Sequence, residues 1–199
     1  MTWLALLAAY LIGGIPFGYL LVRWRTGQDV RRLGSGNIGA TNVLRTQGRA
    51  FGVATLLLDI GKASVAVWIM DRASGGQSGW MAAAAFAVLA GHAFPLFLKF
   101  QGGKAVASFI GAFLYLTPLP LLLCLVVFVV CVAVTRYISF GSMMAAGLFP
   151  LAVWLTMQPA WPLMTAALAS AVLIVWRHRA NLARLRAGTE SVFTFSPRR

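Results

Sequence analysis

Lysine and arginine are sorted along this chain in a way that strongly limits its possible folds. When the 199 residues are divided at their apolar runs, 15 of the 17 Lys and Arg side chains fall in alternate gaps between the runs. These basic gaps contain six cations in 23–49, then Lys99 and Lys104, then Arg136, and six more in 177–199. The other gaps contain only Arg72, and Lys62 lies within an apolar run. Short loops rich in Lys and Arg stay on the cytoplasmic side of a membrane, so the alternation is typical of a multi-pass membrane protein.

The composition supports a membrane protein and argues against one that binds nucleic acid. Hydrophobic residues make up 60% of the chain and charged residues only 11%, whereas a soluble domain is about 25% charged. The formal net charge of +13 comes from cations that lie beside apolar segments rather than in a separate basic patch. We interpret it as cytoplasmic loops that are also attracted to anionic lipid head groups. Cys124 and Cys131 share one apolar run, which indicates neither a disulfide framework nor a metal site.

Seven apolar segments predict an all-α, polytopic membrane helix bundle with seven transmembrane helices. We place these segments at 2–22, 51–70, 80–98, 105–117, 119–135, 142–157 and 160–176. Several are shorter than the ~20 residues of a straight span, which local thinning or a break at Pro or Gly can accommodate. With the basic gaps inside, the N-terminus is outside and the C-terminus cytoplasmic; a five-span alternative would put Lys104 or Arg136 outside. We expect a single domain over 1–199 with a short flexible tail at 191–199.

The first cytoplasmic loop has the composition of an anion-binding loop. Residues 34–49 read GSGNIGATNVLRTQGR, with four glycines, Ser35, and two cations at Arg45 and Arg49. Exposed backbone N–H groups beside Arg can cradle an anion. The spacing is not that of a Walker A motif, because no Gly-Lys-Ser/Thr closes it. An ordinary Gly-rich turn is the alternative.

The second polar stretch places a lysine at the start of an apolar segment. Residues 92–108 read HAFPLFLKFQGGKAVAS. The Gly102-Gly103-Lys104 sequence opens the fourth apolar segment, where the unpaired N–H groups of a helix N-terminus favour a phosphate. A lysine at the membrane interface, with no ligand, is the alternative. We expect His92 to be packed and hydrogen-bonded rather than catalytic.

The third polar stretch follows the last apolar segment. Residues 177–190 read RHRANLARLRAGTE, with basic residues at near-helical spacing. His178 and Asn181 lie three residues apart, so both face one side if the helix is continuous. We expect Glu190 to anchor an arginine rather than to abstract a proton. A surface helix that only binds anionic lipid is the alternative.

Taken together, these stretches resemble a known family. The chain is similar to the bacterial acyl-phosphate-dependent glycerol-3-phosphate acyltransferases, which are integral membrane enzymes of phospholipid synthesis. The resemblance covers nearly the whole chain and is carried by SGNIGATN at 35–42 with Arg45, HAFPLFLKFQGGKA at 92–105, HRANLARLRAGTE at 178–190, YISFGS at 137–142 and DIGKA at 59–63. Ala63 and Ala105 stand where many members have Gly, a mild departure.

The resemblance implies seven spans in the bacterial inner (plasma) membrane, with the active site at the cytoplasmic face. It implies transfer of a fatty acyl group from acyl phosphate to the sn-1 hydroxyl of glycerol 3-phosphate, giving lysophosphatidic acid and phosphate. Acyl phosphate is an activated anhydride, so neither a cofactor nor a metal is expected. The expected partners are the two substrates, membrane lipids and a soluble enzyme that makes acyl phosphate.

Roles for individual residues follow from that chemistry. We assign phosphate binding to Arg45, Lys104 and the Gly102 and Gly103 amides, with Ser142 and Arg184 as weaker candidates. Ser35, His178 and Asn181 would position the attacking hydroxyl and the carbonyl. Asp59 and Lys62 lie three residues apart near the middle of the second apolar segment, and we predict that they form a structural ion pair.

Two questions stay open at this stage. The proton acceptor is either His178 or the substrate phosphate, and we favour the phosphate because its second pKa near 6 suits a base at neutral pH. The alternative function is a membrane transporter or channel for phosphorylated anions. That alternative would require charges along a path through the bilayer, where only Asp59 and Lys62 lie.

Overall fold

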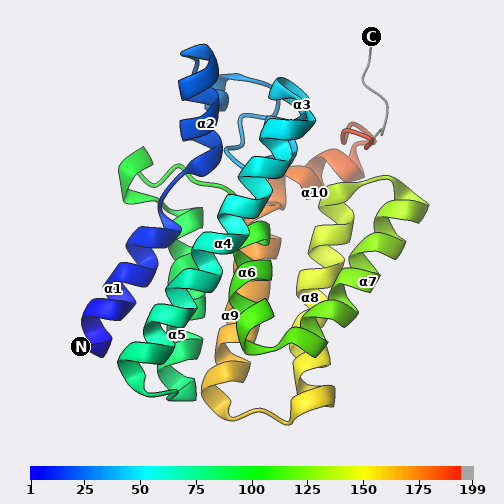
Figure 1. Cartoon of the computed structure of the whole chain (residues 1–199). Helices are drawn as coiled ribbons and strands as arrows, with labels where there is room; N and C mark the ends of the chain where they lie inside the picture. The colour runs from blue at the N-terminus through cyan, green and yellow to red at the C-terminus, as the bar shows by residue number, and fades with distance from the viewer. Residues whose placement is uncertain (194–199) are drawn as a thin grey trace. The chain divides into compact units, whose positions relative to one another are not determined.

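The computed structural model describes residues 1–193, and these residues form ten α-helices and two 3-10 helices without a β-strand (Figure 1). The chain divides into two compact units, the first at Met1–Leu116 and the second from Thr117 onward. Residues 194–199 of the tail predicted at 191–199 lie outside the described residues. The all-α class predicted from the apolar runs is confirmed over the described chain.

The first unit is built around the long helix α4. Its elements are α1 (Thr2–Gly13), α2 (Phe17–Thr26), η1 (Val30–Arg32), α3 (Ala40–Gln47), α4 (Arg49–Ser74), α5 (Ser78–Ala93), η2 (Leu96–Leu98) and α6 (Val106–Leu116). Helix α4 packs against all five of the other α-helices in this unit. Close approach between α1 and α5 depends on glycine, because a Cβ on Gly13 or Gly91 would overlap the backbone of the facing helix.

The second unit contains three long apolar helices and a short basic one. They are α7 (Pro118–Thr135), α8 (Ile138–Met157), α9 (Trp161–Arg177) and α10 (Arg179–Arg186). Helix α8 packs between α7 and α9. The first residues of the predicted tail are tied down, because the N–H of Phe193 donates to the carbonyl of Arg136 at 2.8 Å.

Four helices are long and apolar enough to cross a membrane, namely α4, α5 extended to Leu98, α7 and α8. The predicted first span is not one straight helix: α1 and α2 differ in direction by 41° at a break next to Pro16, and together they would make a fifth span. Helices α6 and α9 are apolar but shorter, with 11 and 17 residues. The described chain therefore supports four or five spans by length and composition.

The exposed faces of these helices are apolar, as lipid contact requires. On α7, Val126, Val129 and Val134 are 62%, 61% and 78% exposed. Such a surface would be costly in water but not in the hydrocarbon of a bilayer, provided that the backbone is hydrogen-bonded within the helix. The core of each unit is instead filled by small side chains and a few large ones such as Phe113 and Phe149.

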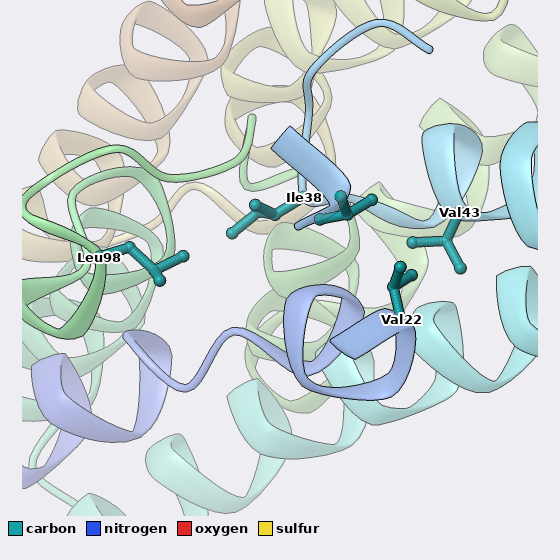
Figure 2. Packing of buried hydrophobic residues seen from close by; sticks show 5 residues of the cluster. Val22, Ile38, Val43 and Leu98 are labelled. Atoms are coloured by element: carbon teal, nitrogen blue, oxygen red, sulfur yellow. The ribbon is translucent and has the colours of Figure 1, made fainter. Parts of the chain in front are cut away.

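A separate hydrophobic cluster supports the polar end of the first unit. It consists of Val22, Val30, Ile38, Val43 and Leu98, and Figure 2 shows how the side chains converge. Ile38 and Val43 lie within the Gly-rich stretch 34–49, whereas Leu98 comes from η2, just before the Gly102-Gly103-Lys104 loop. The cluster therefore holds two of the three predicted anion-binding stretches on one common core.

Candidate active site

The Gly-rich loop of the first unit is organised by the buried side chain of Asn42. Its Oδ1 accepts the backbone N–H of Ser35 at 2.9 Å, and its Nδ2 donates to the carbonyls of Leu33 and Asn37 at 3.0 and 2.8 Å. Asn42 is only 2% exposed, whereas Ser35 is exposed. The side-chain amide of Asn42 thus forms hydrogen bonds with the backbone groups of the turn from its buried side, and Ser35 is left on the exposed side.

The turn itself requires glycine. Gly34 and Gly36 have φ values of +54° and +71°, in the left-handed region where a side chain is strained. A Cβ on Gly34 would also overlap Oδ1 of Asn42. Helix α3 begins directly after this turn, and the exposed Arg45 lies on it one turn beyond Asn42. Ser35 and Arg45 are therefore carried by one rigid loop–helix element.

Lys104 lies just before the N-terminus of α6, as the sequence predicted, and is half-buried. The preceding glycines have a packing role. The N–H of Gly103 donates to the carbonyl of His92 at 3.1 Å, so this amide fixes the loop to α5. A Cβ on Gly102 or Gly103 would overlap atoms of His92. Ala105 is buried and has a φ of +61°, a left-handed conformation that favours glycine over alanine.

Asp59 and Lys62 are in contact inside the first unit. Nζ of Lys62 lies 2.7 Å from Oδ1 of Asp59, and both side chains are 2% exposed. The same ammonium donates to the carbonyl of Ile15 at 2.8 Å, in the break between α1 and α2. It also lies 3.0 Å from Nδ1 of His92, so His92 is packed and hydrogen-bonded as predicted. The pair thereby supplies a second donor to a carbonyl in the break, which also accepts the N–H of Phe17 at 3.2 Å.

In the second unit, His178 stands at the junction of α9 and α10 and is 3% exposed. Its Nδ1 lies 2.8 Å from the carbonyl oxygen of Ile174. A carbonyl only accepts, so Nδ1 carries a hydrogen and donates it to Ile174. The helix is interrupted here, so the condition under which His178 and Asn181 would face one side of a continuous helix is not met. Nδ1 of His178 is therefore oriented by a backbone carbonyl.

The carboxylate of Glu190 accepts hydrogen bonds from three side chains in the second unit. Its Oε1 accepts from Nδ2 of Asn181 at 2.6 Å and from Oγ of Ser139 at 2.8 Å, and its Oε2 accepts from Nε of Arg184 at 2.7 Å. Burial acts to raise the pKa of Glu190, but these three hydrogen bonds outweigh burial and lower it. Glu190 anchors an arginine, as expected, and it fixes Asn181 as well.

Ser142 lies within α8, not at its start, because the helix begins four residues earlier than the apolar segment does. Its hydroxyl donates to the carbonyl of Ile138 at 2.9 Å, and the residue is 5% exposed. The hydroxyl hydrogen is therefore committed to the helix, and only its oxygen lone pairs remain as acceptors. This geometry makes Ser142 a weak candidate for phosphate binding.

Comparison with known proteins decides what these elements belong to. The profile of the glycerol-3-phosphate acyltransferase family matches residues 3–188. A glycerol-3-phosphate acyltransferase from Geobacter sulfurreducens is 47% identical over 186 residues, which is 93% of this chain and 94% of that protein. One from Trichlorobacter lovleyi is 47% identical over 196 residues, or 97% of each chain. The chain belongs to the glycerol-3-phosphate acyltransferase family.

Solved structures of such an enzyme have the same fold. A crystal structure of PlsY, an integral membrane glycerol 3-phosphate acyltransferase in its glycerol 3-phosphate form, matches with a TM-score of 0.92 and 33% identity, covering 97% of this chain and 96% of that one. The lysophosphatidic acid form of PlsY matches with a TM-score of 0.88 and 31% identity, covering 97% and 95%. This acyltransferase is therefore an integral, multi-pass membrane protein.

Each unit of the acyltransferase brings part of the predicted site together. In the first unit, the segments that carry Ser35, Arg45 and Lys104 pack on the hydrophobic cluster of Val22, Val30, Ile38, Val43 and Leu98. In the second unit, His178, Asn181 and Arg184 lie on or beside α10. Sequence reasoning missed two organising side chains, Asn42 and Ser139. Asn42 had a signal, because an amide next to several glycines is suited to satisfying turning backbone. Ser139 lies in the YISFGS stretch that carries the resemblance, but its contact with Glu190 joins residues 51 positions apart, so the spacing does not indicate this role.

Proposed function

We propose that this acyltransferase moves a fatty acyl group from acyl phosphate to the sn-1 hydroxyl of glycerol 3-phosphate, yielding lysophosphatidic acid and phosphate. The observation that carries the proposal is the similarity over 97% of the chain to an acyltransferase whose structures are described as glycerol 3-phosphate and lysophosphatidic acid forms. The composition supports it, because both substrates are phosphorylated and one carries a long alkyl chain. Basic loops beside apolar helices suit that pair of substrates.

In the first unit, Arg45 and Lys104 bind substrate phosphate. Arg45 offers a planar fork of donors at an exposed position, and Lys104 supplies a point charge at a helix N-terminus. The Gly102 and Gly103 backbone brings the lysine to this place. Ser35, held by Asn42, orients the glycerol hydroxyl or the carbonyl oxygen.

In the second unit, Asn181 and His178 align the reacting groups. Asn181 commits its Nδ2 to Glu190, which fixes the orientation of its side-chain carbonyl. Nδ1 of His178 donates to the Ile174 carbonyl, so Nε2 is the ring nitrogen that would bind the glycerol hydroxyl. Arg184 and Ser142 are secondary contacts for phosphate, since Arg184 already pairs with Glu190.

The transfer needs alignment and one proton acceptor, without a covalent enzyme intermediate. The glycerol hydroxyl oxygen forms a bond to the acyl carbonyl carbon, and the bond from that carbon to the bridging phosphate oxygen breaks. The hydroxyl proton passes to a phosphate oxygen, so the products are the ester and hydrogen phosphate. A phosphate with a second pKa near 6 is a suitable base at neutral pH, and His178 orients the hydroxyl rather than keeping the proton.

We further propose seven spans in the bacterial plasma membrane, with the N-terminus outside and the chemistry at the cytoplasmic face. The short helices α6 and α9 would be the fourth and seventh spans, and the α1–α2 pair the first. The positions of the cations support this orientation. All 199 residues then act as one domain, supplied by a soluble enzyme that makes acyl phosphate.

The activity is tested with purified protein in detergent, acyl phosphate and radiolabelled glycerol 3-phosphate. We expect labelled lysophosphatidic acid only when both substrates are present. Movement of glycerol 3-phosphate into sealed liposomes without product would instead support the transporter alternative.

The orientation is tested by single cysteines in a variant with Cys124 and Cys131 replaced by alanine. A cysteine at Ser78 should react with an impermeant thiol reagent in intact cells, whereas one at Gly48 should react only after permeabilisation. The reverse pattern would overturn the proposed orientation.

A further inference from the structure

A buried cluster of Asp59, Lys62 and His92 takes no part in the proposed transfer, yet it adjoins the loop that carries Lys104. The three residues are 1%, 6% and 4% exposed. Asp59 and Lys62 come from α4, and His92 from the last turn of α5. Burying two charged side chains and a histidine costs desolvation free energy. We therefore expect their contacts to serve a role beyond packing.

The contacts of Lys62 fix the state of the His92 ring. The Lys62 ammonium donates to the Ile15 carbonyl at 2.8 Å, lies 3.0 Å from His92 Nδ1, and forms an ion pair with Asp59 Oδ1 at 2.7 Å. An ammonium cannot accept, so Nδ1 of His92 is the acceptor and the ring hydrogen is on Nε2. Asp59 pairs with the lysine, and the contact of Lys62 with Nδ1 holds the imidazole in one orientation.

His92 touches the following loop with both its backbone and its ring. Its carbonyl accepts the N–H of Gly103 at 3.1 Å. A Cβ on Gly103 would overlap Nε2, and its three nearest neighbours would all be atoms of the His92 ring. At Gly102 the nearest neighbours are instead the carbonyl oxygens of His92 and Ala93 and the Pro95 ring. The His92 ring therefore meets the residue immediately before Lys104 and sets how closely the loop approaches α5.

We infer that His92 is a positioning residue for Lys104, with Asp59 and Lys62 holding its ring in place. The inference rests on the proposed phosphate-binding role of Lys104 and adds the group that places it. Movement of a phosphate ligand by as little as ~1 Å is enough to cost about two decades in rate. A histidine that only filled the core would affect stability without being coupled to Lys104.

The first test is a double-mutant cycle between His92 and Lys104. His92→Asn is the suitable variant, because its side-chain oxygen can keep the Lys62 hydrogen bond while the outer ring atoms are removed. If His92 acts through Lys104, His92→Asn raises the same substrate KM that Lys104→Ala raises, by about tenfold. The double variant is then no worse than Lys104→Ala alone. Losses in kcat/KM that multiply in the double variant would overturn the inference.

The second test uses the contact of the ring with Gly103. Gly103→Ala should lower kcat/KM by about 100-fold, and adding His92→Asn should recover at least about tenfold of that loss. Gly102→Ala is the matched control, because its obstruction is mainly backbone and should not be relieved by His92→Asn. Equal recovery in both backgrounds, or none in either, would contradict the inference. Should His92→Asn fail to fold, Gly103→Ala still must raise the same KM as Lys104→Ala.

Wild-type protein measured alongside separates two kinds of failure. If wild type forms no lysophosphatidic acid, the proposed function fails and the inference fails with it. If wild type is active and the thermal midpoint of His92→Asn is unchanged, wild-type kinetics in that variant would overturn the positioning role alone.

Discussion

The side-chain amide of Asn181 donates to the carboxylate of Glu190 at 2.6 Å, so one of the residues proposed to align the substrates is held by the single acid of the last polar stretch. Ser139 and Arg184 complete this group from α8 and α10. Glu190 is thereby a structural centre for the end of the second unit, and its charge is what its three donors recognise. Its removal should disturb stability and activity together.

Glu190→Gln should be destabilising and should change the response to acid. The amide nitrogen of Gln would face a donor, and the cost is about 2 kcal/mol. The lowered pKa of Glu190 means that its contribution is present above its ordinary value of 4.5 and is lost as pH falls through the lowered value. The thermal midpoint of wild type should therefore fall more steeply below pH 4.5 than that of Glu190→Gln. Arg186→Ala, an exposed change on α10, is the control. If the thermal midpoint falls equally below pH 4.5 in wild type, Glu190→Gln and Arg186→Ala, the structural role assigned to the Glu190 carboxylate is wrong.

Arg45→Ala and Lys104→Ala should each lower kcat/KM by about one to two decades. Each removes a charge-assisted partner of a phosphate, a contribution of ~1.5–3 kcal/mol. Lys99→Ala provides the comparison, because Lys99 is exposed in the same stretch and has no assigned role. Near-normal kinetics for Arg45→Ala and Lys104→Ala in well-folded protein would exclude both from substrate binding.

Asn42→Asp should disable the Gly-rich loop. The carboxylate oxygen would replace Nδ2 and face the carbonyls of Leu33 and Asn37, a repulsive contact in a buried place. We expect a loss of about 2 kcal/mol in stability and a larger fractional loss of kcat/KM than of folded yield. Thr46→Val removes only a hydroxyl that donates to the Asn42 backbone, and it should stay active. Comparable loss in both variants would argue against the organising role of Asn42.

Asp59 and Lys62 should be more tolerant of joint removal than of single neutralisation. A lone charge in a membrane-spanning helix costs at least ~2.5 kcal/mol. Asp59→Asn strands the lysine and Lys62→Met strands the carboxylate, so each should lower folded yield more than the double variant does. Size-exclusion chromatography of detergent extracts measures this. If the folded yield of the double variant is no higher than that of the worse single variant, Asp59 and Lys62 do not act as a stabilising pair.

The sequence predicts the helices of this protein better than the contacts of its loops. Apolar runs predict helices because the bilayer forces backbone hydrogen bonds into the segment itself, and α7 matched its predicted segment closely. The break at Pro16 divides the predicted first segment, and proline interrupts a helix by itself. The hydrogen bond from the Lys62 ammonium to the Ile15 carbonyl within this break joins residues 47 positions apart, so spacing along the chain does not predict it. The sequence predicts that the Gly102 and Gly103 amides bind phosphate. The close approach of these glycines to His92 is a contact of the folded unit, which the sequence does not indicate. Spacing along the chain carries no information about such contacts.

Direct acyl transfer is tested most directly by intact-protein mass spectrometry together with two-substrate kinetics. A covalent route would need a nucleophile with an adjacent oriented base. Ser35 is the hydroxyl of the Gly-rich loop, and its described contact is a backbone hydrogen bond to Asn42. Protein incubated with acyl phosphate alone should gain no acyl mass, and double-reciprocal plots for the two substrates should intersect. An acyl adduct on Ser35 that glycerol 3-phosphate removes, or parallel lines, would contradict direct transfer.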